Sequence, residues 1–206
     1  RPRGAPPPHT LAQRGYATMA LHFLARRSVE DPALIRYRVR LADLDRHHFE
    51  VECRIDNPSA EQRFSLPAWI PGSYLLRDFA RHVVHVEARS GRQPLVAEKI
   101  DAATWVVKGA EKTLTLTIVV YALDPSVRGA YLDRRRGYFN GPCLFLLPEG
   151  REAEDIELTL ESPPHSICED WRVASALEPS DLDENGFGTY RAADCDELLY
   201  HPVEIG

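Results

Sequence analysis

The residues that could perform catalysis are scattered along the sequence, and no motif joins them. A zinc peptidase site needs His-Glu-x-x-His on a helix, which places two imidazoles and a glutamate base on one face. None of the eight histidines is followed by glutamate. His82 and His85 are three residues apart, but the valines around them favour a strand, on which the two rings point to opposite faces. We therefore predict no catalytic residue and no metal site in this chain.

Motifs for nucleophilic catalysis and phosphate binding are also missing from the sequence. There is no G-x-S-x-G elbow, and Gly72-Ser73 belongs to a Pro-Gly turn, where serine is an ordinary turn residue. The stretch 186–188 lacks the third glycine of a dinucleotide-binding loop. No pair of cysteines has the close spacing of a zinc or redox motif. We expect all four to be reduced: Cys53, Cys143, Cys168 and Cys195.

The composition is that of an ordinary globular chain and excludes two classes of partner. Hydrophobic residues make up 44% of the 206 residues and charged residues 27%. A formal net charge of -6 disfavours nucleic acid, because phosphate binding requires an excess of lysine and arginine. The basic run 134–136 is too short to reverse this, and we expect it at a solvated loop tip. No apolar stretch reaches the roughly 18–20 residues that cross a bilayer, so we predict no membrane span.

The first 18 residues differ from the rest of the chain. They are rich in arginine and proline and contain no acidic residue, a composition that transit peptides also have. Because Met19 is the only methionine, we interpret residues 1–18 as a disordered or non-native tail and residues 19–206 as one folded domain. No apolar segment of useful length follows the arginines, so we expect no secretory signal and a cytoplasmic location.

Apolar and polar residues alternate with a period of two along most of the chain. This pattern is typical of strands that have one buried and one solvated face. Turn residues separate the alternating segments, and sixteen prolines leave little room for long helices. The sequence therefore predicts an all-β fold, an antiparallel β-sandwich of two packed sheets with few short helical turns. We expect strands near 36–41, 49–56, 83–86, 104–107, 113–118 and 156–161, and helical turns near 74–79 and 193–199.

Two segments depart from the strand pattern. Residues 66–74 combine two prolines, a glycine, Trp69 and Tyr74 in a rigid stretch that is not a strand. Residues 137–142 place two aromatic side chains before Asn140-Gly141, a dipeptide typical of tight hairpin turns. From the residues alone we favour structural roles for both segments, although their aromatic side chains also suit an interface.

These two segments resemble motifs of the N-terminal domain of the glycyl aminopeptidase family. The resemblance extends from about Ile35 to the last residue and implies a β-sandwich that precedes a thermolysin-like zinc catalytic domain. That domain is missing here, so we expect a truncated chain that is not itself an enzyme. Arg77 to Arg81, which follow the first segment, match as well. The further matching features, in order, are His48-Phe49-Glu50-Val51, Trp105, Tyr121-Ala122, Val127-Arg128, Ala130 to Asp133, Phe139-Asn140-Gly141, Asp194 to Leu198 and His201 to Gly206.

The resemblance also implies a role for the second segment. In related aminopeptidases the N-terminal domain borders the active-site cleft and helps to bind the free amine of the substrate. We expect Tyr138, Asn140 and Gly141 to form that border. Asn140 would offer its side-chain oxygen to an ammonium group, and Gly141 would allow close approach. Zinc is implied only for the missing catalytic domain, and the implied partners are that domain and a peptide substrate.

The residues leave a second function open, that of a free-standing β-sandwich which binds a protein or carbohydrate partner. Trp69, Tyr74 and Tyr138 would then form the recognition surface. A domain without its catalytic partner should expose an apolar patch near residues 69–74 and should self-associate. An independent binding module should instead be monodisperse.

Overall fold

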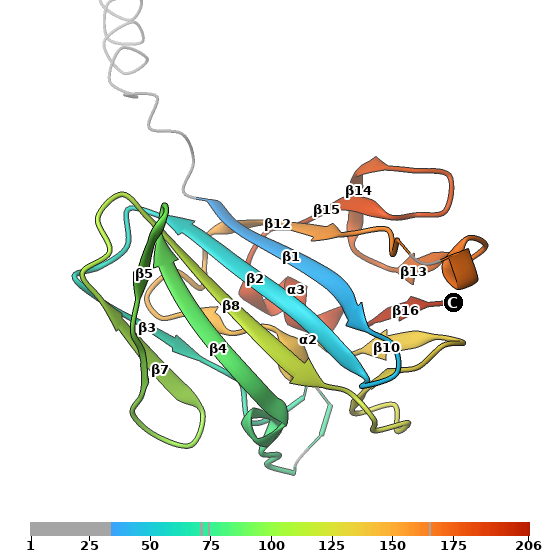
Figure 1. Cartoon of the computed structure of the whole chain (residues 1–206), viewed down its shortest axis with the longest axis horizontal. Coiled ribbons are helices and arrows are strands. Elements are labelled where there is room, and N and C mark those ends of the chain that lie inside the picture. Colours follow the sequence, from blue (N-terminus) through green and yellow to red (C-terminus); the bar gives the residue numbers. More distant parts are fainter. Residues whose placement is uncertain (1–33, 71, 74, 165) are drawn as a thin grey trace, which may run out of the picture. The chain divides into compact units, whose positions relative to one another are not determined.

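Eight strands form the largest sheet, in the order β14-β15-β12-β1-β2-β8-β4-β5. The computed structural model describes residues 34–70, 72–73, 75–164 and 166–206, so the predicted tail lies outside the described residues. Figure 1 shows β4, β8, β2 and β1 side by side across the front of the view. Neighbouring strands are antiparallel except β1 and β12, which are parallel. Their bounds are β1 Leu34–Asp43, β2 His48–Asp56, β4 Val83–Ser90, β5 Gln93–Leu95, β8 Thr113–Tyr121, β12 Asp155–Leu160, β14 Glu178–Leu182 and β15 Gly188–Ala192.

Two four-stranded sheets accompany the large one, in the orders β13-β16-β10-β9 and β11-β3-β7-β6. The predicted antiparallel, all-β sandwich is confirmed. There are three sheets where two were predicted, because turns divide the remaining residues into strands of at most five residues. The bounds are β3 Glu61–Ser65, β6 Ala97–Lys99, β7 Thr104–Lys108, β9 Ala130–Leu132, β10 Gly137–Phe139, β11 Leu147–Pro148, β13 Val173–Ser175 and β16 Val203–Ile205.

The helical elements are short. They are α2 Gly141–Leu144, α3 Cys195–Tyr200 and the 3-10 turns η1 Phe79–His82 and η2 Ser166–Cys168. Helix α3 confirms the turn predicted near 193–199, and its start is capped reciprocally. Asp194 accepts from the backbone N–H of Glu197, while the Glu197 carboxylate accepts from the backbone N–H of Ala193. The turn predicted near 74–79 begins only at Phe79, and Tyr74 lies outside the described residues.

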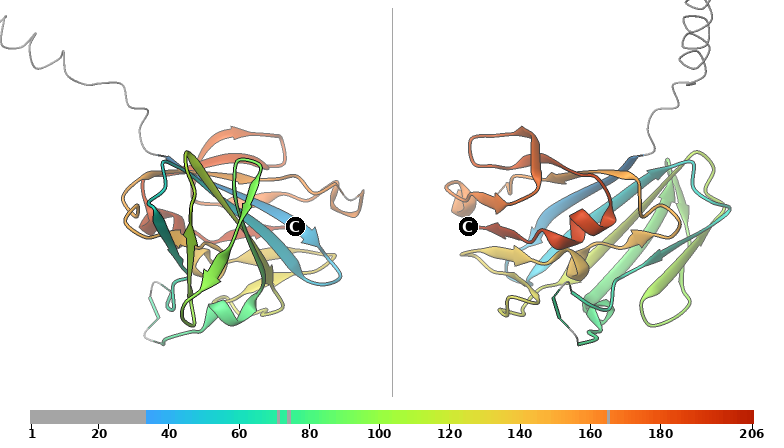
Figure 2. Two further views of the ribbon diagram at one scale, coloured as in Figure 1. Left: turned by 60° about the vertical axis from the view of Figure 1, so that its left-hand side comes forward. Right: turned by 180° about the vertical axis from the view of Figure 1, so that it is seen from behind.

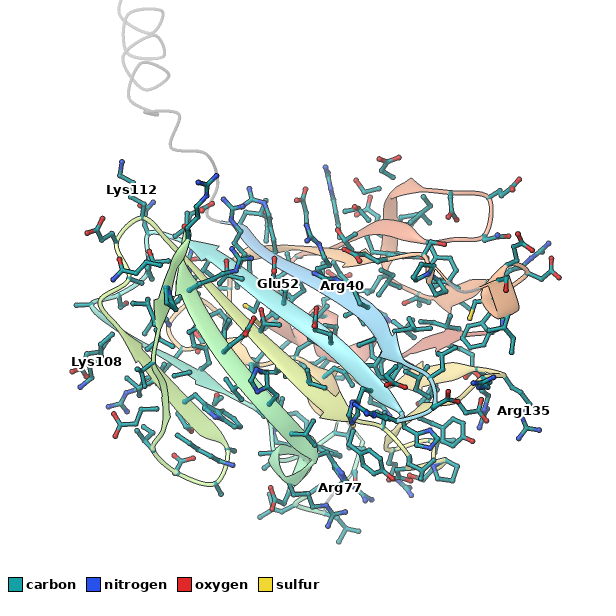
Figure 3. The ribbon with its side chains drawn as sticks, viewed as in Figure 1. Arg40, Glu52, Arg77, Lys108, Lys112 and Arg135 are labelled. Atoms are coloured by element: carbon teal, nitrogen blue, oxygen red, sulfur yellow. The ribbon has the colours of Figure 1, made fainter. Side chains whose placement is uncertain are left out.

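The outer face of the large sheet is covered by ion pairs. Alternate residues of β1 point inward and are buried, whereas its three arginines lie on the other face. In Figure 3, Arg40 and Glu52 lie on this face, toward the viewer. The face is therefore solvated and polar. The pairs include Arg36–Asp56 at 2.9 Å, Arg38–Glu161 at 3.1 Å, Arg40–Glu50 at 2.8 Å and Arg89–Glu52 at 2.9 Å.

A chain of aromatic rings joins the large sheet to β10 and α2. Phe139 meets Phe49 edge-to-face at 5.5 Å between ring centroids and Phe145 at 5.9 Å, and Phe145 meets Tyr37 at 5.0 Å. The Tyr37 hydroxyl donates to the Leu146 carbonyl oxygen at 2.9 Å. Helices α2 and α3 lie behind the large sheet in Figure 1 and come forward when the domain is turned around in Figure 2. The inner surface of β1 and β2 is thus tied to β10 by contacts that exclude water.

Phe139 should be the most sensitive position in this chain of rings. Phe139→Ala removes a fully buried ring that contacts two others, so we expect the free energy of unfolding to fall by about 3–5 kcal/mol. Urea denaturation followed by circular dichroism measures this. Leu123→Ala, at an exposed position, is the control and should change stability by less than about 0.5 kcal/mol. Equal effects of the two substitutions would contradict the role of the rings.

The buried thiols should make the free energy of unfolding depend on pH in the alkaline range. Burial raises the pKa of Cys53 from 9.0 to about 12. The unfolded chain releases this proton near pH 9 and the folded chain only near pH 12, so stability is full below pH 9 and falls as pH rises through this range. One thiol contributes a slope of up to about 1.4 kcal/mol per pH unit.

Two substitutions on β2 test whether Cys53 causes this slope of unfolding free energy against pH. Cys53→Ala should make the unfolding free energy less dependent on pH between 9 and 12. Val51→Ala, at an equally buried position on the same strand, should lower stability without changing the slope. Urea titrations at several pH values measure both, and identical slopes for the two variants would disprove the assignment.

Candidate functional site

Asn140 lies where β10 passes into α2. The tight hairpin turn predicted at Asn140-Gly141 is wrong, because Asn140 has φ -87° and ψ 144°, an extended conformation. A two-residue hairpin turn of this type requires positive φ at both central residues. Pro142 follows in the first turn of α2, where its fixed φ suits a helix start and its missing N–H has no partner to lose. The chain therefore continues from strand into helix instead of reversing.

Tyr138 and Asn140 reach the same neighbouring carbonyl group. Because Phe139 between them is buried, they lie on the opposite face of β10. The Tyr138 hydroxyl donates to the Val127 carbonyl oxygen at 2.8 Å, and Nδ2 of Asn140 donates to the same oxygen at 2.7 Å. Only the amide nitrogen can donate, so these bonds fix the orientation of the amide. They direct Oδ1 away from Val127, and no described group donates to it.

The loop that carries Val127 is closed by its own hydrogen bonds. The backbone N–H of Asp124 donates to the Ala130 carbonyl oxygen at 2.9 Å, and the Asp124 carboxylate accepts from the backbone N–H of Ser126 at 2.9 Å. Gly129 is required here because an added Cβ would lie 2.5 Å from the Asp124 carboxylate. Its carbonyl oxygen also accepts from the backbone N–H of Asn140 at 3.3 Å. The loop and Asn140 therefore hold each other in place.

Gly141 has a structural neighbour that the sequence did not suggest. Its Cα faces the backbone of α3, and an added Cβ would lie 2.8 Å from Cα of Leu199 and 3.0 Å from the Leu198 carbonyl oxygen. Helix α3 thus accounts for the glycine, and close approach of a ligand to Gly141 stays a prediction. Because Gly141 lets α2 contact α3, it also fixes the start of α2 and the position of Asn140 before it.

A cavity of about 210 Å³ shares Gly129 with this site. In Figure 3, Arg77 of the cavity lies at the lower end of the view, near η1 and the ends of β4 and β8. Burial, and then Arg81, lowers the pKa of His82. Burial, and then Asp124, raises the pKa of Cys143 to about 12, so its thiol stays protonated at neutral pH and is no nucleophile. The cavity is lined by Leu76, Arg77, Asp78, Phe79, Arg81, His82, Val120, Tyr121, Asp124, Gly129, Ala130 and Cys143.

Exposed apolar side chains occur in the two segments that contribute Leu76 and Gly129 to the cavity. Leu76, which lines it, is 84% exposed, and Val127 in the neighbouring loop is 75% exposed. Trp69, Leu75 and Leu123 are exposed beside them in sequence. We call these five residues the apolar rim. An apolar patch was predicted near residues 69–74, and the rim places exposed apolar side chains there and extends them to the loop of Val127.

The described residues contain no group of three or more His, Cys, Asp or Glu side chains that could hold a metal ion. All four cysteines are free and buried. In the part of the chain that the structure describes, no helix is long and apolar enough to cross a membrane. The basic run predicted at a loop tip is exposed between β9 and β10, where Figure 3 shows Arg135 at the margin of the domain.

The sequence pointed to Tyr138 and Asn140 but not to the groups that they contact. The partners are the backbone carbonyls of Val127 and Gly129, which no residue type reveals. It also assigned no role to Arg77 or Asp124, which come together only through the fold. For Arg77 the sequence did offer one indication, because the stretch from Arg77 to Arg81 resembles a family motif.

Comparison with known proteins assigns the chain to a family. Residues 36–206 match the model described as the Peptidase M61 N-terminal domain. The crystal structure of an aminopeptidase N family protein from Idiomarina loihiensis is 37% identical, with a TM-score of 0.80. That match covers 84% of this chain but only 29% of the Idiomarina chain. A comparison with curated proteins finds no match.

Two further structures are similar, with lower sequence identities and TM-scores. An M1 zinc metallopeptidase variant from Deinococcus radiodurans is 10% identical with a TM-score of 0.48, covering 85% of this chain and 42% of its own. Native yeast LTA4 hydrolase is 12% identical with a TM-score of 0.46, covering 85% and 28%. At these values neither similarity supports a conclusion about this chain. The match over residues 36–206 and the Idiomarina structure agree on one assignment: the chain belongs to the Peptidase M61 N-terminal domain family.

Proposed function

We propose that this chain is the non-catalytic N-terminal domain of a zinc aminopeptidase that acts on peptides with small N-terminal residues. It packs against the catalytic domain and borders the substrate cleft. The observation that carries the proposal is the apolar rim in a domain of a peptidase family, because its member Val127 accepts hydrogen bonds from Tyr138 and Asn140. The Idiomarina protein, of which this chain covers 29%, supports a larger parent protein.

The distribution of surface side chains favours one docking face. The outer face of the large sheet carries compensated charges, which are already solvated and gain little from a partner. The apolar rim has the opposite character, since its side chains are large, apolar and exposed, and one of them, Leu76, lines a cavity with charged residues. Apolar patches with polar surroundings are typical of protein interfaces. We assign the catalytic domain as the partner that covers this face, because the chain belongs to a family of peptidase N-terminal domains.

Asn140 is suited to receive the free amine of a peptide. Its amide nitrogen is held by the Val127 carbonyl oxygen, so Oδ1 is available as an acceptor in a fixed direction. An ammonium group offers three N–H donors and binds such an oxygen through a charge-assisted hydrogen bond. Tyr138 contributes by donating its hydroxyl proton to the same carbonyl group, and burial raises the pKa of this hydroxyl further above its usual value of 10.0.

The described residues of this chain offer no ligand set for the zinc ion of the proposed enzyme, since no three of their His, Cys, Asp or Glu side chains come together. We therefore assign the metal and the reacting groups to the catalytic domain. The contribution of this chain is to bind and orient the peptide and to exclude water from one side of the cleft. A failure of these roles would appear in substrate binding and in the assembly of the two domains.

The apolar rim should make the chain self-associate when its partner domain is missing. Val127→Glu introduces a charge into the rim, and we expect it to shift the chain toward monomer. Val96→Glu is the matched control, because Val96 is 79% exposed, close to the 75% of Val127, but lies between β5 and β6. Sedimentation velocity over a range of concentrations measures the effect. A chain that is monodisperse without substitution would contradict the docking face and favour a free-standing binding module.

Asn140 should affect catalysis in the larger protein. In the natural protein that includes the catalytic domain, Asn140→Ala removes the acceptor for the substrate amine, so kcat/KM for a glycyl peptide should fall by about tenfold to a hundredfold. Asn185→Ala is the control, because it also removes an amide that donates to a backbone carbonyl, but in a distant turn. Unchanged kinetics for Asn140→Ala, or equal losses in both variants, would refute the role of Asn140.

A further inference from the structure

Arg81 and His82, at the end of η1, are joined by a hydrogen bond between their side chains. Nε of Arg81 donates to Nε2 of His82 at 3.1 Å. The turn that carries them is anchored, because Phe79 and Ala80 are buried and the backbone N–H of Val83 donates to the Ala80 carbonyl oxygen. The contact is therefore held by a fixed stretch of backbone at the wall of the cavity, which both residues line.

This hydrogen bond requires one protonation state of His82. A guanidinium group has only donors and keeps its charge at any ordinary pH. Nε2 of His82 is therefore the acceptor, so the ring is neutral and carries its proton on Nδ1. Protonation would place an N–H group at Nε2, opposite the N–H of Arg81, and two cationic groups would face each other. The hydrogen bond and the protonated ring exclude each other.

The groups around His82 favour the neutral ring at neutral pH. Burial, and then the neighbouring arginine, lowers the pKa of His82, whereas the carboxylates of Asp124 and Asp78 oppose this without reversing it. On β4, which follows η1, the side chains of His85 and Glu87 face each other at 3.6 Å. The other ionisable groups on the cavity wall are Arg77 before η1, Tyr121 at the end of β8 and Cys143 of α2.

Protonation of His82 also changes the charge of the cavity wall. At neutral pH the two arginines, Arg77 and Arg81, are balanced by the carboxylates of Asp78 and Asp124. A protonated His82 adds one positive charge and removes the acceptor that holds the side chain of Arg81. The wall then carries a net positive charge, and Arg81 is no longer fixed to the turn.

We propose that the hydrogen bond between Arg81 and His82 is a pH-sensitive switch in the wall of this cavity. The bond is formed while His82 is neutral, and it breaks when acidification protonates the ring. The proposal concerns this chain alone and does not depend on the proposed aminopeptidase function, which rests on the apolar rim and Asn140.

NMR observes this switch directly. The 206-residue chain, labelled with 15N, is titrated from neutral to acidic pH. An N–H···N hydrogen bond transmits a scalar coupling between its two nitrogens, so we expect a correlation between Nε of Arg81 and Nε2 of His82 at neutral pH. The correlation should disappear at the midpoint of the His82 titration, which lies below the usual 6.5. A missing correlation at neutral pH would overturn the proposal, and so would one that persists after His82 is protonated.

Substitutions test the cause of the titration. Arg81→Met removes the donor and the charge at similar side-chain length, so the proton affinity of His82 should rise by about threefold to tenfold. Arg135→Met is the matched control at an exposed loop position and should leave the titration of His82 unchanged. His85→Gln removes the next histidine along the chain and should leave the correlation in place.

An unchanged titration of His82 in Arg81→Met would overturn the proposal. Because the titration of the unchanged chain follows the hydrogen bond itself, it decides the matter even where a variant does not fold.

Discussion

The burial of Phe139 between the large sheet and α2 is the interaction on which the rest of the candidate site depends. Its ring contacts Phe49 of β2 and Phe145 after α2, so β10 is held against the large sheet. Successive residues of a strand point to opposite faces, and an inward Phe139 therefore directs Tyr138 and Asn140 outward. The hydrophobic core thus decides which side chains face outward at the end of β10.

Two glycines allow the close backbone contacts that fix the residues on either side of Asn140. Gly141 lets α2 lie against the backbone of α3, which fixes the point where β10 ends. Gly129 lets the Asp124 side chain lie against the backbone of its own loop, and its carbonyl oxygen accepts from the backbone of Asn140. The loop that contains Gly129 therefore contributes to both features: the Gly129 carbonyl oxygen accepts from the backbone of Asn140, and Gly129 itself lines the charged cavity with Arg77.

The fold was largely predictable from the sequence, because the alternation along β1, β2, β8 and β12 reports directly which face of each strand is buried. The site was predictable only in part. Asn140-Gly141 was expected to be a tight turn because local preference favours one, but Pro142 and the packing of α2 on α3 favour a helix start. The cavity combines Arg77, Asp124 and Cys143, residues far apart in sequence, so no local pattern could show it.

We propose above that this chain forms one domain of a larger zinc peptidase, and the mass of the natural protein tests this most directly. Native mass spectrometry of the natural protein, isolated from its source with an antibody to this domain, reports the mass and the bound metal together. We expect a species well above the 23.3 kDa of this chain, with zinc bound. A species of about 23.3 kDa without zinc would contradict the claim and would favour a free-standing binding module.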